Sequence, residues 1–592
     1  MRRSILLLAA AFGLSPPAVV DAAAPRVLDI IDPQAVAAVL AVDNVSALDR
    51  KARDFLAAVG GPDFGGLAFI LDAMGLSRGL DLEGSLAILL PGAAAPAQPA
   101  RPLAWGDLVV LAPVRDAAAF FASVNARGEG DLRSFEYSGD RVFVRPFGPS
   151  HIALGGRDDL VAALRPATGA LPRTLEDLGP LGAAVAEESD IVLLGEIRPI
   201  LAMLRDLTRA ARGAGPGLPP AADQPSGDNP AQQPAEPGDA AALVQGSFAG
   251  RLGRVFIDES RASIVGLTFA PLALRVDVAS GFAPESMLRA ATSAHAEGAP
   301  ARSGLALLAR NPYVLALALD AAHPTVRMIA DELAPPRRAR GVLAEAEYAI
   351  LGSIDSMDAA AVAVYAPPSL TFGVLSRTVA AWSSPTPDEG ARAFESWIEG
   401  LTGKVLRAGA PALTTAYRES AATIAERPAD TWSITAPPGM GPLTIAYGAH
   451  PSIDGVLVRA PDYAHLTWSR DAALVEASVR APAGPQDASL AGDELLTQVR
   501  ALLPEPRFAE AFADVSPVLS QLGPLMRMFA GGPGGGPGDL LADVPEQLPP
   551  LGAALTARDG SARATIIVPT PLVQLGVQLY QRVSENQPEP AP

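Results

Sequence analysis

The feature that most constrains the fold of this chain is an internal duplication, because five pairs of segments recur in the same order. The pairs are Pro33–Asp43 with Pro312–Asp320, Asp81–Pro91 with Asp358–Pro367, Asp116–Val124 with Asp388–Ile398, His151–Val161 with His465–Val475, and Glu196–Leu201 with Asp514–Leu519. Ordered self-similarity of this kind indicates that one structural unit occurs twice. We therefore expect two lobes built from equivalent strands and helices.

The offsets between paired positions show where the two halves differ in length. In sequence numbering, the offset is 277 for Asp43 and Asp320, 276 for Pro91 and Pro367, 274 for Phe120 and Phe394, 314 for His151 and His465, 318 for Pro199 and Pro517, and 287 for Pro284 and Pro571. The second half therefore carries about 40 extra residues near positions 404–440, and the first half carries about 31 extra residues after Pro199.

A segment of nearly the second length is visible in the sequence. Residues 212–239 are rich in proline, glycine and glutamine, a composition that buries too little apolar surface to fold, so we expect a disordered insertion there. The expected organisation is a signal peptide over 1–24, a first α+β repeat over 25–300, and a second α+β repeat over 301–592.

The N-terminus has the pattern of a secretory signal peptide. Arg2 and Arg3 precede a short apolar stretch over Ile5–Leu14, and small residues favour cleavage after Ala22 or Ala24. No later apolar run is long enough to cross a bilayer, so we expect no transmembrane helix in the mature chain. The chain has no cysteine, which excludes disulfides and thiolate metal sites. These features predict a periplasmic or secreted protein.

Local patterns within each half favour an α+β fold. Asp116 is a good N-cap for a helix, and Phe135–Val144 alternates around a turn like a β-hairpin. His151–Leu154 is an expected strand followed by a helix over Asp158–Leu164. Hairpins and short helices predict a mainly antiparallel sheet with packed helices in each lobe; the alternative is a doubly wound parallel sheet. The helix after Pro571 is expected to pack on the second half.

The charge balance excludes one class of partner. The formal net charge is −18 and the sequence pI is about 4.8, so the phosphate backbone of a nucleic acid would be repelled. Apolar residues make up 49% of the chain, enough for most of it to bury a core.

Few residues point to catalysis. His151 and His465 are placed at equivalent repeat positions, either as structural histidines at strand edges or as two related catalytic or ligand sites. Gly75-Leu76-Ser77-Arg78-Gly79 matches the GxSxG string of a nucleophile elbow, but a helix pattern precedes it and a strand pattern follows, which favours a helix C-cap at Gly75. The acidic pairs Asp158–Asp159 and Glu187–Glu188 are expected at the surface. The catalytic residues stay unknown, and the sequence assigns neither a cofactor site nor a metal site.

The segments Asp81–Pro91, Leu108–Phe121 and His151–Leu164, taken with the export signal, resemble a loose family of large exported proteins of planctomycete-type bacteria. The resemblance implies no activity and no site residues.

Three functions remain open. The first is a non-catalytic exported protein that binds a partner or an apolar ligand through a sheet face or the cleft between the lobes. The second is a carboxylate- or histidine-dependent hydrolase of the cell envelope. The third is a structural envelope protein.

Overall fold

The structure is a computed structural model of the 592-residue chain. It describes residues 24–62, 66–73, 76–92, 105–128, 130–200, 248–294, 303–334, 348–349, 351–368, 373, 375–404, 412–435, 452–469, 471–529 and 544–585. The predicted signal peptide, apart from Ala24, and the predicted disordered insertion over 212–239 lie outside the described residues.

The chain forms two compact units. Unit 1 comprises Met1–Pro234, Phe256–Ala290 and Arg558–Pro592, and unit 2 comprises Ala235–Val255 and Ala291–Ala557. The units differ from the expected repeats over 25–300 and 301–592 chiefly in the C-terminal segment, which belongs to unit 1. The reason is a long-range strand pairing, since the last strand, β19, pairs along its whole length with β9 of unit 1.

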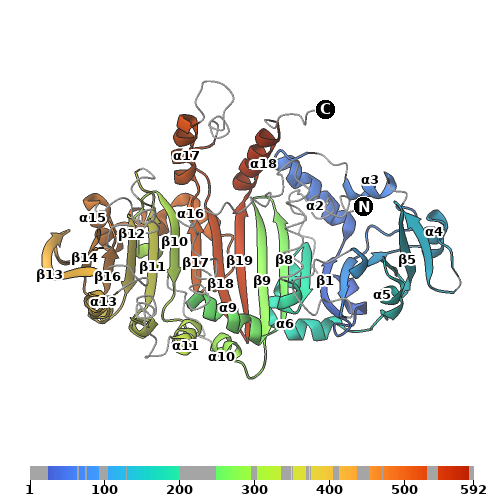
Figure 1. The fold of residues 1–592 in the computed structure, drawn as a ribbon, viewed down its shortest axis with the longest axis horizontal. Coiled ribbons are helices and arrows are strands. Elements are labelled where there is room, and N and C mark those ends of the chain that lie inside the picture. Colours follow the sequence, from blue (N-terminus) through green and yellow to red (C-terminus); the bar gives the residue numbers. More distant parts are fainter. Residues whose placement is uncertain are drawn as a thin grey trace, which may run out of the picture. The chain divides into compact units, whose positions relative to one another are not determined.

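Unit 1 contains an antiparallel sheet. Its strands are β1 (Val36–Val42), β2 (Leu86–Pro91), β3 (Val109–Pro113), β4 (Arg133–Tyr137), β5 (Asp140–Phe147), β6 (His151–Gly155), β7 (Ile191–Gly195), β8 (Ser260–Ala270), β9 (Ala273–Phe282) and β19 (Ser561–Pro569). Their order in the sheet is β4-β5-β6-β3-β2-β1-β7-β8-β9-β19. Figure 1 shows β8, β9 and β19 side by side.

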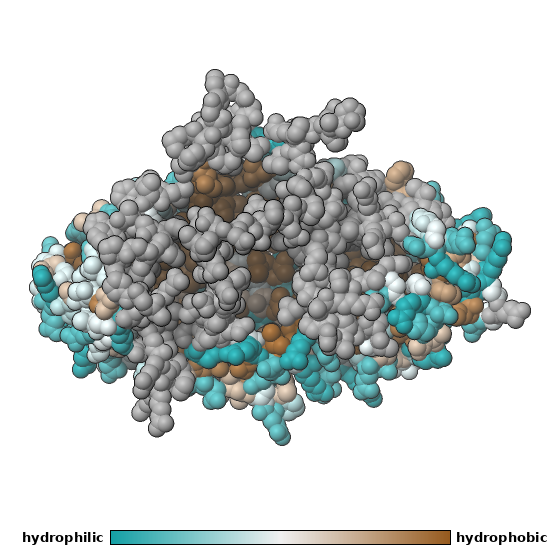
Figure 2. Space-filling model, in the orientation of Figure 1, coloured by the Kyte–Doolittle hydropathy of each residue, from teal (hydrophilic) through white to brown (hydrophobic). Residues whose placement is uncertain are grey.

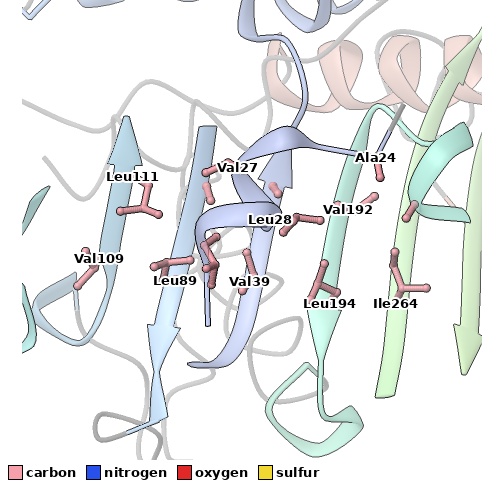
Figure 3. Close-up of a cluster of buried hydrophobic side chains, with 14 of the residues drawn as sticks. Ala24, Val27, Leu28, Val39, Leu89, Val109, Leu111, Val192, Leu194 and Ile264 are labelled. Atoms are coloured by element: carbon pink, nitrogen blue, oxygen red, sulfur yellow. The ribbon is translucent and has the colours of Figure 1, made fainter. Parts of the chain in front are cut away.

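The two faces of the unit 1 sheet are covered differently. The helices are α2 (Val45–Ala58), α3 (Gly66–Ala73), α4 (Ala117–Ser123), α5 (Asp158–Ala163), α6 (Leu171–Glu188), α10 (Met287–Ser293) and α18 (Thr570–Glu585), with α9 (Phe248–Glu259) divided between the units. On one face, α6 and the 3-10 helix η1 (Arg26–Ile30) close the largest apolar core. Figure 3 shows Leu28 of η1 lying against the strands that carry Val39 and Leu194.

Unit 2 contains a second set of antiparallel strands. They are β10 (Tyr313–Leu319), β11 (Ala359–Tyr365), β12 (Thr378–Ser383), β13 (Thr414–Ile424), β14 (Arg427–Thr435), β15 (Ser452–Arg459), β16 (Tyr463–Thr467), β17 (Ala509–Ala513) and β18 (Leu551–Arg558). Their order is β13-β14-β15-β16-β12-β11-β10-β17-β18. Strands β13 and β14 fall in the region where the sequence predicts extra residues, 404–440.

The helices of unit 2 surround an aromatic-rich core. They are α11 (Pro324–Leu333), α13 (Pro387–Leu401), α15 (Ala472–Arg480), α16 (Glu494–Arg500) and α17 (Ser516–Phe529), and the 3-10 helix η4 (Gly304–Leu307) precedes β10. Helix α13 buries Ile398 and Leu401 against Trp382 of β12 and Trp432 of β14. Large aromatic side chains supply much of the burial energy of a core, so this cluster anchors α13 to the sheet.

Several local expectations are confirmed. The Asp116 carboxylate accepts a hydrogen bond from the Ala119 backbone amide at 3.0 Å and begins α4. Strands β4 and β5 form the expected hairpin, with Ser138 and Gly139 at positive φ in its turn. The α+β class is confirmed, and the doubly wound alternative is wrong because the strand pairings described in both units are antiparallel. The C-terminal helix α18 packs on unit 1 through Val573 and Val577, and not on the second half as expected.

Within the described ranges, none of the helices combines the length and the apolar character that crossing a membrane requires.

Candidate functional site

The two histidines singled out in the sequence are each hydrogen-bonded to a backbone carbonyl group. His151 Nε2 lies 2.8 Å from the Ser85 carbonyl oxygen, and His465 Nε2 lies 2.8 Å from the Leu307 carbonyl oxygen. Burial lowers the pKa of His151, and burial lowers the pKa of His465 to about 4. Neither imidazole has a carboxylate within hydrogen-bond distance among the described residues, which favours the structural interpretation of both.

The GxSxG string does not have the setting of a nucleophile elbow. Helix α3 ends at Ala73, before the string, and the next regular element described after it is strand β2. The Ser77 hydroxyl donates a hydrogen bond to the Asp72 carboxylate at 2.8 Å. The acceptor of this hydroxyl is therefore a carboxylate and not the histidine base of a catalytic triad. An elbow needs a strand before the serine and a helix after it, and here the order is reversed.

A more extensive feature lies on the face of the unit 1 sheet opposite α6, which we call the apolar face of unit 1. Residues directly opposite one another on neighbouring strands point to the same side of a sheet. One row across six strands is therefore Ile88, Leu40, Leu193, Val265, Val278 and Ala564. The next row begins with the pair Leu86 and Val42 and continues with Ile191, Leu267, Val276 and Ile566. The ladder between β1 and β7 ends at Ala41 and Val192, and Val42 and Ile191 follow it in one apolar cluster. Every side chain in both rows is apolar.

Unit 2 has an equivalent surface, the apolar face of unit 2, made of three rows across β11, β10, β17 and β18. The rows are Ala360, Leu319, Ala509 and Leu555; Val362, Leu317, Ala511 and Ala553; and Val364, Leu315, Ala513 and Leu551. The opposite side of the same strands carries the fully buried Ala316 and Phe512. In β10, which reads Tyr-Val-Leu-Ala-Leu-Ala-Leu, the alternation expected of a strand with one wet face is thus replaced by apolar residues on both faces.

Parts of these apolar faces remain exposed. The exposed fraction is 41% for Leu317, 42% for Leu555 and 43% for Ile566. In Figure 2, brown apolar surface is visible over the strands that Figure 1 draws in orange, β17 and β18. Contiguous apolar surface of this kind, unlike a single exposed leucine, is typical of a binding site.

Helices cover the flanks of the unit 1 face. Helix α4 buries Phe120 and Phe121 over the β3 side, and α2 and α18 pack Phe55 and Val573 over the ends of β8 and β9. Between these flanks, Val276, Val278 and their partners across β19 stay partly exposed. The described residues therefore frame a strip whose two rows consist of apolar side chains.

The other face of β9 and β19 carries a charged network that the sequence reasoning missed. Asp277 Oδ1 accepts hydrogen bonds from Arg563 Nε at 2.8 Å and from the Thr565 hydroxyl at 2.6 Å. Arg275 Nε lies 2.8 Å from Asp277 Oδ2, and Glu188 Oε2 accepts from Arg275 Nη2 at 2.9 Å and from Arg563 Nη2 at 2.8 Å.

This network joins β9, β19 and α6, and its two positive and two negative side chains balance. Asp277 is fully buried, and Arg563 is 5% exposed. Buried charges require partners of this kind, so the network fastens the C-terminal strand rather than offering free groups for catalysis. Its sequence signal was the alternation of charged and apolar residues over Arg275–Val278, which places the charges on one face of the strand.

In the part of the chain that the structure describes, no group of three or more histidine, aspartate or glutamate side chains could hold a metal ion. Comparisons of the chain with protein-family models, with curated proteins and with solved structures found no match.

Proposed function

We propose that this protein is an exported, non-catalytic binding protein that carries hydrocarbon chains, such as the acyl chains of lipids, on its apolar sheet faces. The observation that carries the proposal is the set of uninterrupted apolar rows on the apolar face of unit 1 and on the apolar face of unit 2. Ile566 is exposed on the first face, and Leu317 and Leu555 are exposed on the second. Location in the periplasm or outside the cell is part of the proposal, supported by the N-terminal pattern at Arg2 and Arg3.

The chemistry of the faces supports a hydrocarbon rather than a peptide. A bound peptide brings backbone amide and carbonyl groups that cost free energy when buried without partners. Peptides solve this by pairing with a free sheet edge, whereas the backbone groups of β10 and β17 are already used in ladders on both sides. An acyl chain needs no hydrogen bond, and each of its methylene groups gains about 0.8 kcal/mol on leaving water.

The dimensions are also suitable. Neighbouring strands are about 4.8 Å apart, so the six-strand row of unit 1 is about 24 Å wide. One leaflet of the hydrocarbon core of a bilayer is about 15 Å thick, which is the reach of a common acyl chain. Leu193 on β7 is only 4% exposed, so the open part of the row lies over β8, β9 and β19, where an acyl chain can contact Val265, Val278 and Ala564.

We further propose that the two halves arose by duplication, so that each chain carries two such sites. The strand orders β6-β3-β2-β1-β7-β8 and β16-β12-β11-β10-β17-β18 support this. The register shift between Val36 and Ala38 in β1 also recurs between Tyr313 and Leu315 in β10. The two register shifts are separated by the same number of residues as Asp43 and Asp320.

The registers correct three of the sequence matches and support the other two. Val36 pairs with Pro91 and Tyr313 pairs with Tyr365, so Pro91 corresponds to Tyr365 and its match with Pro367 is two residues out of register.

We align β1 with β10 by the offset of Asp43 and Asp320 and then count paired residues across the neighbouring strands. Through β2 and β3 in unit 1, and β11 and β12 in unit 2, Pro113 corresponds to Ser383. Pro113 pairs with His151 and Ser383 pairs with Tyr463, so His151 corresponds to Tyr463. His151 and His465 therefore lie on equivalent strands but two residues out of register, so their predicted equivalence is wrong. By the same ladders, the helix N-caps Asp116 and Thr386 correspond, and the match of Phe120 with Phe394 is one helical turn out of register.

One of the two supported matches, that of Pro199 with Pro517, lies just after β7 and β17 in the chain. Leu193 and Ala511 oppose Leu40 and Leu317, which have the same offset as Asp43 and Asp320. The offset between Leu193 and Ala511 equals the offset between Pro199 and Pro517, so the ladders and the sequence match agree. Strands β9 and β19 extend the comparison. Asp277 of β9 pairs with Thr565 of β19, and each of these residues follows an arginine, Arg275 or Arg563, by two positions.

The proposal is tested by loading the purified full-length chain with palmitate and counting the bound molecules by native mass spectrometry. We expect two palmitates per chain. Leu317→Glu and Ile566→Glu each place a charge on one apolar face, and each variant should retain one palmitate. Leu272→Glu is the matched control, because Leu272 is 68% exposed in the β8–β9 turn and should leave both sites intact. Absence of palmitate on the parent chain, or two palmitates on both face variants, would refute the proposal.

No described observation favours the hydrolase hypothesis, since neither His151 nor His465 faces a carboxylate among the described residues. The structural envelope role and the likeness to exported planctomycete-type proteins stay predictions.

A further inference from the structure

Ala24 lies in the core of unit 1, at one of the two positions where the sequence predicts cleavage of a signal peptide. Its exposed fraction is 8%, and it belongs to the largest apolar cluster of the unit. Figure 3 shows it among the buried side chains of this cluster. The sequence pattern allows cleavage after Ala22 or after Ala24, and the burial of Ala24 makes the two products different.

The residues that follow Ala24 are also held against the unit. Pro25 is buried, and its carbonyl oxygen accepts a hydrogen bond from the Leu28 backbone amide at 2.9 Å, at the start of η1. The Arg26 backbone amide donates to Asp43 Oδ1 at 3.4 Å. The chain is therefore packed and hydrogen-bonded from Ala24 onward, and a cut directly after Ala24 would alter this packed region.

The two cuts place the new N-terminal charge differently. Cleavage after Ala24 would remove its methyl group from the core and leave an ammonium group on the buried Pro25. A charge at a buried position costs free energy unless it is paired and hydrogen-bonded. Cleavage after Ala22 keeps Ala24 in the core and puts the ammonium group on Ala23, two residues before the buried proline. Burial therefore favours the product that begins at Ala23.

The chemistry of the two peptide bonds independently favours the same product. A signal peptidase needs small residues at the first and third positions before the bond, which are Ala22 and Val20 for one site and Ala24 and Ala22 for the other. The bond after Ala24 leads into Pro25, which has no N–H group and whose ring crowds the nitrogen of that bond. A strand held through its backbone N–H and C=O groups loses a donor there. Only the bond after Ala22 is followed by a residue with a free N–H.

We propose that a signal peptidase cuts this chain between Ala22 and Ala23, so that the exported protein retains Ala24 as a core residue of unit 1. The step is hydrolysis: water adds across the peptide bond, leaving the Ala22 carboxylate on the released peptide and the Ala23 ammonium group on the protein. The inference rests on the export that is part of the proposed function. It makes the signal peptide two residues shorter than the expected segment 1–24.

The test is to produce the full-length chain in a bacterial host with a periplasm and to determine the N-terminus of the exported protein by intact-mass measurement and N-terminal sequencing. We expect the chain to begin at Ala23. Val20→Glu changes the third position before the proposed bond only, and this variant should keep its signal peptide. The matched control Ala24→Val puts a branched side chain directly before the other bond, and this variant should still begin at Ala23.

An exported parent chain that begins at Pro25 would overturn the inference and leave export intact. Processing that is blocked by Ala24→Val but not by Val20→Glu would overturn it in the same way. A parent chain that stays uncut in the cytoplasm would refute export, and the cleavage site with it. The palmitate count on the purified chain depends on neither result, so binding of hydrocarbon chains and the cleavage site fail independently.

Discussion

Replacing Asp277 by asparagine should destabilise unit 1 while leaving its shape unchanged. The asparagine amide would keep the volume of the side chain and one carbonyl oxygen, but it would remove the charge that faces Arg563 and Arg275 at 2.8 Å. The side chain of Arg563 is 5% exposed, so water cannot replace the lost carboxylate. Breaking a buried ion pair from one side costs about 3–5 kcal/mol, and we expect the lower end because Glu188 still pairs with both arginines.

The assay is equilibrium unfolding in urea, followed by circular dichroism. With a urea dependence of about 3 kcal/mol per molar, the loss of about 3 kcal/mol lowers the midpoint of the unit 1 transition by about 1 M. The control is Asp258→Ala, which removes a pair with Arg198 whose side chains are 63% and 73% exposed and should cost less than about 1 kcal/mol.

A double variant sharpens the test. In Asp277→Asn/Arg275→Met, one cation is removed together with the buried anion, so Arg563 and Glu188 are left as a balanced pair. The double variant should lose at least about 1 kcal/mol less than the sum of the two single losses. If Asp277→Asn unfolds at the same urea concentration as the parent, or if the two losses simply add, the network does not fasten β19 to β9 and α6.

Two further predictions concern unit 2. The unfolded chain takes up a proton at His465 near pH 6.5 but the folded chain only near pH 4, so the free energy of unfolding should fall by about 3 kcal/mol as the pH drops through this window. His465→Gln should flatten that dependence in urea titrations at several pH values, and an unchanged slope would contradict the burial argument. Gly455→Ala should cost about 3 kcal/mol, because a Cβ there would lie 1.7 Å from the Thr467 carbonyl oxygen. The control Gly576→Ala meets no atom within 4 Å and should not lower the melting temperature, whereas equal melting temperatures for both variants would refute the packing argument.

The sequence by itself determined the local elements and the α+β class. Asp116 begins a helix because its carboxylate satisfies a free backbone amide within three residues, and Phe135–Val144 forms a hairpin because its turn needs only two residues at positive φ. Interactions over such short separations depend on neighbouring residues alone.

Only the tertiary structure decided which distant strands meet and in which register. The pairing of β19 with β9 and the burial of Asp277 between two arginines both depend on ladders between residues far apart in the chain. A slip of one residue moves every side chain to the opposite face, and apolar strands such as β10 give no local preference between the two faces. The register is therefore set by packing of the whole sheet, and with it the apolar faces on which the proposed function rests.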